Sequence, residues 1–94
     1  MTSRPILYRI HAIQRMFERR VSEEKVKEVV QSGEMIEDYS DEMPYPSALM
    51  LGGHGNQPLH VVMAENTRDH GAVVITVYKP HPSQWKPGFR DRRK

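Results

Sequence analysis

Residues 72–78 read Ala-Val-Val-Ile-Thr-Val-Tyr, and this run of β-branched side chains decides the fold class of the chain. Valine, isoleucine and threonine favour extended backbone over helix, so the run predicts a strand. Residues 59–65 read Leu-His-Val-Val-Met-Ala-Glu and predict a second strand, with a turn over 66–71 between the two. The pair is therefore expected to form an antiparallel hairpin.

The alternation of side chains along this hairpin predicts its register. Successive side chains of a strand point to opposite faces of the sheet, so aligning the two more apolar faces pairs even-numbered residues with even-numbered residues. His60 is then expected opposite Tyr78 or Thr76. The other face, with Val73, Ile75 and Val77, is the one we expect a helix to cover.

The part of the chain before this hairpin predicts two helices and two further strands. The first helix is expected over 10–19. Its apolar stripe consists of Ile10, Ile13, Met16 and Phe17, and we expect this stripe to pack on the sheet. The second helix is expected over 22–32, with Ser22 as its N-cap and Gly33 as its terminator. Shorter strands are expected over 35–39 and 47–51. The prediction is an α+β fold of two helices followed by an antiparallel sheet of about four strands.

Residues 79–94 form a tail with its own composition. Prolines at 80, 82 and 87 forbid regular structure there, and Trp85 and Phe89 are expected to pack the tail onto the single domain of 94 residues. The tail carries six basic residues and one acidic residue, whereas residues 34–45 carry five acidic residues and no basic one. This distribution is compatible with polyanion binding and equally with a mixed surface.

The composition excludes several classes of chemistry. The absence of cysteine removes disulfides, thiolate catalysis and cysteine-type zinc sites. The five histidines show no tight ligand spacing, so neither a metal nor another cofactor is expected. No apolar run approaches the roughly 20 residues of a membrane span, and no signal peptide is evident. The expected location is the cytoplasm.

Several short motifs together resemble a known family. They are residues 11–19 (HAIQRMFER), 44–47 (PYPS), 58–62 (PLHVV) and 76–80 (TVYKP), followed by Trp85. In this order they resemble the bacterial family called domain of unknown function 4258, and more distantly the RelE/ParE-like toxins of toxin–antitoxin pairs. Two positions depart from the family pattern. Arg20 stands where members tend to have glycine, and His81 stands where they favour aspartate.

The resemblance implies a RelE-like fold and an RNA-cleaving toxin that an antitoxin keeps silent. Metal-independent cleavage of RNA uses the 2′-hydroxyl as nucleophile, and it needs a base, an acid and cations over the phosphate. The candidates for these roles are His11, Arg15, His60 and Tyr78. His11 lies in the first turn of the first predicted helix, where the dipole favours the neutral imidazole, and Arg15 follows one turn later.

Each candidate also has a structural interpretation. His11, Arg15 and Glu18 fit a surface cluster, His60 fits a half-buried histidine, and Tyr78 fits a cross-strand packing residue. His11 and His60 share one site only if the first helix starts at a sheet edge.

Contacts to RNA, free or on the ribosome, are expected from Arg19, Lys79, Arg90 and Arg92. Two other functions stay open. One is a non-catalytic module that binds protein or RNA, and the other is a toxin that binds a protein target such as a topoisomerase. Homodimerisation also stays open.

Overall fold

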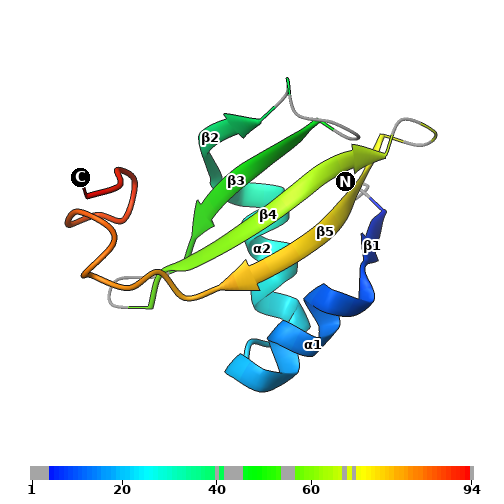
Figure 1. Cartoon of the computed structure of the whole chain (residues 1–94). Helices are drawn as coiled ribbons and strands as arrows, with labels where there is room; N and C mark the ends of the chain where they lie inside the picture. Colours follow the sequence, from blue (N-terminus) through cyan, green and yellow to red (C-terminus); the bar gives the residue numbers. More distant parts are fainter. Residues whose placement is uncertain are drawn as a thin grey trace.

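The computed structural model describes residues 5–39, 41, 46–53, 57–66, 68 and 70–93. Two helices and a five-stranded sheet make up the fold, which is α+β as expected (Figure 1). In chain order the elements are β1 Ile6–Tyr8, α1 Ile10–Arg19, α2 Glu23–Ser32, β2 Glu34–Tyr39, β3 Ser47–Gly52, β4 Leu59–Asn66 and β5 Gly71–Tyr78. The two predicted helices and four predicted strands are confirmed to within one residue. Neither described helix has the length and apolarity needed to cross a membrane.

The fifth strand, β1, corrects the expectation of an antiparallel sheet of about four strands. The strand order is β1-β5-β4-β3-β2, and β1 runs parallel to β5 with Ile6 opposite Ala72 and Tyr8 opposite Val74. The sheet is therefore mixed. A strand of three residues is too short to show a period of two, so the sequence contains little signal for it.

The start of α2 and the ends of both helices are fixed by local contacts that differ from one terminus to the next. The Ser22 hydroxyl caps α2 by accepting a hydrogen bond from the Lys25 backbone N–H at 3.2 Å. Arg20 ends α1 in the left-handed conformation (φ 56°, ψ 44°), and the Val21 N–H bonds the Met16 carbonyl at 2.9 Å. Gly33 ends α2 with ordinary extended backbone, and a Cβ there would lie 2.8 Å from the Leu51 carbonyl oxygen. Gly33 therefore serves close approach to β3 rather than a left-handed cap.

The apolar stripe of α1 does not pack on the sheet as expected. Ala12 is fully buried and Met16 packs partly against the core, whereas three other stripe residues point into solvent. Their exposed fractions are 75% for Ile10, 52% for Ile13 and 86% for Phe17, and Leu7 of β1 is 57% exposed beside them in sequence. The small side chain of Ala12 is what contacts the sheet, so the helix is rotated relative to the predicted packing. An exposed apolar surface results.

A β-bulge changes which residues of β5 face the helices. His60 pairs with Tyr78 and Val62 with Thr76, but Met63 pairs with Val74, which leaves Ile75 as an extra residue. Beyond the bulge the parity of β5 is reversed. Val77, Val74 and Ala72 are buried in the core, so the predicted set Val73, Ile75 and Val77 was wrong at two of its three positions.

The two faces of the sheet have different covers. One face packs against α1 and α2, and the core there includes Val26, Val29, Val61 and Val74. Figure 1 shows α2 crossing behind the strands and α1 beneath β5 and β1. The opposite face carries His60 and Leu49, and residues of the tail cover it.

Candidate functional site

The tail residue Trp85 and the strand residue His60 form the centre of the tail-covered face. Trp85 is 2% exposed and His60 is fully buried. Their rings meet edge to face, and the rings of His60 and Tyr78 do the same with centroids 5.1 Å apart. His60 is paired with Tyr78, one of the two partners predicted for it, and the predicted pairing of even with even residues is confirmed at this end of the hairpin.

The hydrogen bonds of His60 define its tautomer. A carbonyl oxygen can only accept, so Nε2–H donates to the Phe89 carbonyl at 2.9 Å, and Nδ1 accepts from the Tyr78 hydroxyl at 3.1 Å. Burial lowers the pKa of His60, while the bond to the Phe89 carbonyl and the charge of Glu37 oppose that shift. Burial likewise raises the pKa of Tyr78. Both groups are neutral at pH 7.

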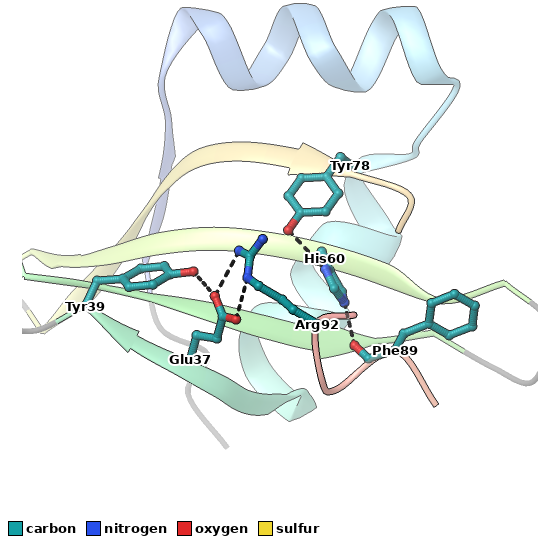
Figure 2. Close-up of polar contacts among 6 residues, drawn as sticks. All are labelled: Glu37, Tyr39, His60, Tyr78, Phe89 and Arg92. Carbon is teal, nitrogen blue, oxygen red and sulfur yellow. Dashed lines mark hydrogen bonds and ion pairs between the residues drawn. The ribbon is translucent and has the colours of Figure 1, made fainter. Parts of the chain in front are cut away.

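An ion pair joins the tail to the edge strand β2. Arg92 donates from Nε to Glu37 at 2.8 Å and from Nη2 at 3.0 Å, and the Tyr39 hydroxyl donates to the same carboxylate. The Arg92 guanidinium also lies 4.6 Å from the centre of the Trp85 ring. Figure 2 shows Arg92, Glu37 and Tyr39 together over one face of the sheet. The bond from Arg92 is the main reason that the pKa of Glu37 is lowered.

A second ion pair links Arg90 to Glu34 at 2.7 Å. Two of the basic tail residues expected to contact RNA are thus paired with acidic residues of β2. The acidic segment that the sequence analysis identified holds the basic tail in place, at a separation of 55 to 56 residues along the chain.

A groove of about 480 Å³ lies between the tail, β5 and the end of α1. Because β1 pairs only with residues up to Val74, the second half of β5 has no neighbouring strand on this edge among the described residues. The groove is lined by Thr76, Val77, Tyr78, Lys79, His81, Gln84, Trp85, Arg92 and Arg19. Three predicted RNA contacts, Arg19, Lys79 and Arg92, therefore come together with Tyr78.

His81 is the groove residue that the sequence analysis did not select. It is exposed, and its Nδ1 lies 2.7 Å from the Ser83 hydroxyl and 3.1 Å from the Ser83 backbone nitrogen, which donates to it. These contacts hold the imidazole ring through Nδ1 and do not involve Nε2. One feature of the sequence could have identified His81 as a groove residue. It lies three residues after Tyr78 and between two prolines, which end the strand and turn the chain there.

The other two predicted catalytic residues lie elsewhere. His11 is exposed on α1, and Arg15 on the same helix pairs with Glu18 at 3.0 Å. Neither lines the groove. Since α1 covers the face of the sheet opposite His60, the structure does not bring His11 and His60 together.

In the described part of the chain, no group of three or more histidine, aspartate or glutamate side chains is arranged to hold a metal ion. Among known families, the model for a domain of unknown function (DUF4258) matches residues 8–79. Neither the curated proteins nor the solved structures contain a match to the chain.

Proposed function

The chain belongs to the DUF4258 family, whose description names no activity, and we propose from the geometry that the groove beside β5 binds and cleaves RNA without a metal ion. The observation that carries the proposal is the convergence of three cationic side chains with a hydrogen-bonded tyrosine–histidine pair. Arg19 and Lys79 supply positive charge for a phosphate, and the ion pair with Glu37 holds the Arg92 guanidinium at the groove. Tyr78 lies between that groove and the buried His60.

The first proton transfer in this proposal runs through Tyr78. The 2′-hydroxyl attacks the adjacent phosphorus, and its proton passes to the Tyr78 oxygen while the Tyr78 proton moves to Nδ1 of His60. The low basicity of a neutral phenol makes a direct base role unfavourable, whereas a neutral imidazole behind it can accept the proton. His60 thus acts through Tyr78 as a positioning residue, and the resulting imidazolium keeps its Nε2–H bond to Phe89.

The second transfer gives a proton to the leaving 5′-oxygen, and water in the groove supplies it. Nδ1 of His81 accepts from the Ser83 backbone N–H, so the ring proton lies on Nε2, which donates a hydrogen bond to that oxygen. The imidazolium formed at His60 then returns its proton to water through Tyr78, and the enzyme regains its starting state. The products are a 2′,3′-cyclic phosphate and a free 5′-hydroxyl.

The biological context belongs to the same proposal. A RelE/ParE-like relationship, a toxin role in the bacterial cytoplasm, an antitoxin partner and RNA presented by the ribosome all fit an RNA-cleaving groove. Support comes from the motif resemblance and from the groove's chemistry. The fold class alone supports no activity.

A second candidate function is protein binding without catalysis, which the exposed face of α1 favours. Ile10, Ile13 and Phe17 form an apolar surface on a helix that ends in Arg19 and Arg20. An acidic, apolar segment of a partner protein complements that surface. A second copy of the chain would bring like charges together, so analytical ultracentrifugation at low salt is expected to find a monomer.

Cleavage is tested with pure folded protein and a 5′-labelled single-stranded RNA at low salt in EDTA. We expect fragments that end in 2′,3′-cyclic phosphate, and an intact DNA strand of the same sequence, because DNA lacks the nucleophile. The assay is repeated with translating ribosomes. RNA that stays intact in both settings contradicts the proposal and leaves the binding function.

A further inference from the structure

A second cavity, of about 440 Å³, adjoins the RNA-binding groove. Lys79 lines both, and Arg20 of the cavity follows Arg19 of the groove directly in sequence. Its lining is formed by Arg20, Val21, Lys25, Gln57, Pro58, Leu59, Lys79, Pro80, Pro82 and Phe89. A strand of RNA with a phosphate at Lys79 has a neighbouring base within reach of this cavity.

The cavity combines apolar side chains with basic side chains that can only donate hydrogen bonds. Val21, Leu59, Phe89 and the prolines offer flat apolar surface for a ring, whereas Arg20, Lys25 and Lys79 carry donors alone. Gln57 behaves as a donor as well. Its Oε1 accepts from the Lys25 ammonium at 2.7 Å, so its amide NH2 is the group left to bond a ligand.

From this we propose that the cavity is a nucleobase pocket that selects guanine or uracil, which carry a keto oxygen at ring position C6 or C4, over adenine and cytosine, which carry an amino group there. The inference rests on the proposed RNA-binding function and adds the specificity of the site. Donors of arginine, lysine and amide groups match the O6 and N7 acceptors of guanine and the O4 acceptor of uracil. The amino groups that adenine and cytosine carry at the ring positions of O6 and O4 would face other donors, and leaving such groups unpaired is costly.

Phe89 links this pocket to the proposed proton path. Its ring lines the cavity while its carbonyl accepts the Nε2–H bond of His60, and Figure 2 shows the ring directed away from that histidine. The backbone of Phe89 has a positive φ of 59°, and Gly88 before it has a φ of 91°. In this turn the ring of Phe89 and its carbonyl point to different sites. A base seated against Phe89 therefore contacts the residue that orients His60.

The test measures binding of fluorescein-labelled ten-residue RNAs by anisotropy at low salt. One RNA is all adenosine, and three others carry a single central guanosine, uridine or cytidine. The wild-type protein is expected to bind the guanosine or uridine RNA about tenfold more tightly than the other two. Gln57→Leu and the near-isosteric Gln57→Glu are each expected to reduce that ratio to about twofold or less. Thermal melts of both variants verify folding.

Lys25→Met provides the charge variant and Lys27→Met its matched control, since Lys27 lies on α2 outside both cavities. Only Lys25→Met is expected to reduce the preference. Equal affinity of the wild-type protein for all four RNAs, or an unchanged ratio in folded Gln57 variants, overturns the base pocket and leaves the proposed function standing. Failure to bind any RNA overturns both.

Discussion

The ring of His60 stands at 87° to the ring of Trp85, with centroids 4.4 Å apart, so the most buried polar side chain of the sheet is sealed by the only tryptophan of the chain. This contact makes Trp85 fluorescence a direct reporter of tail docking. It also places an ionisable group where a charge is unfavourable, which has consequences for stability.

The stability of the fold should fall as the pH drops below about 6.5. The pKa of His60 is lowered in the folded state, so the unfolded chain binds its proton first, and the native state loses stability as pH falls through the unfolded value of 6.5 toward the lower folded one. Urea unfolding followed by Trp85 fluorescence between pH 8 and 5 measures this. His60→Gln should remove the dependence in that window. A separate loss should remain when the titration is extended below pH 4.5, because the pKa of Glu37 is lowered in the folded state and the unfolded chain therefore binds that proton first.

Tyr78→Phe should abolish RNA cleavage while RNA binding persists. The phenol oxygen is the proposed carrier of the 2′-hydroxyl proton, and loss of one proton-transfer step reduces the rate by about 10²–10⁴-fold. Single-turnover kinetics with saturating protein separate the rate from affinity. Tyr39→Phe is the matched control because its hydroxyl bonds Glu37 rather than His60. Equal rates for the two variants would remove Tyr78 from the mechanism.

Lys79→Ala should reduce the salt dependence of RNA binding. Each phosphate contact to a single strand contributes about −0.7 to the slope of log K against log salt, so loss of one contact makes the slope shallower by about that amount. Anisotropy titrations over 50–300 mM KCl measure the slope. Lys86→Ala removes the same charge from a residue that lines neither cavity and should leave it unchanged.

Arg20→Gly should stabilise the protein by about 0.5 kcal/mol. A left-handed conformation costs a residue with a Cβ about 1–2 kcal/mol, and the larger entropy of unfolded glycine offsets much of that gain. Chemical denaturation gives the difference in free energy of unfolding. Arg19→Gly, one residue earlier and inside α1, should instead destabilise by about 1 kcal/mol.

Phe17→Ser should change the free energy of unfolding by less than about 0.5 kcal/mol, because the side chain is 86% exposed. Ala12→Leu on the same helix should destabilise by about 1–3 kcal/mol, since Ala12 is fully buried against the sheet and leaves no space for a larger side chain. Thermal melts of the two variants distinguish the observed rotation of α1 from the predicted one. The reverse order would restore the packing first expected from the stripe.

These outcomes follow from what periodicity can and cannot reveal. The alternation in 59–65 and 72–78 was enough to place His60 and Tyr78 on one face, because parity fixes a face wherever the ladder is regular, but it did not choose between Tyr78 and Thr76 as the partner of His60. One inserted residue, Ile75, reversed that parity and is invisible in a pattern of consecutive β-branched residues. The sequence of α1 is amphipathic, but amphipathicity alone does not tell which side of the helix packs on the sheet. In the structure Ala12 packs there, and the apolar residues Ile10, Ile13 and Phe17 stay exposed.

The geometry of the candidate site was predictable only for residues that are neighbours in one ladder, although Arg19, Lys79 and Arg92 were selected from the sequence as RNA contacts and do line the groove. The ion pair of Arg92 with Glu37 joins segments 55 residues apart, and no local pattern links an acidic strand to a basic tail. His81 was missed for the same reason, since its partners in the groove come from α1, β5 and the tail.

The parallel pairing of β1 with β5 has a further consequence for the order in which the protein is made. Ile6 finds its partner Ala72 only after more than 60 further residues have been synthesised, and Trp85 and Arg92 follow later still. Contacts this distant in sequence form late and slow the folding of a small domain. A nascent chain therefore has no groove beside β5 until the segment from Lys79 to Arg92 has left the ribosome, so the proposed action on RNA has to wait for that segment.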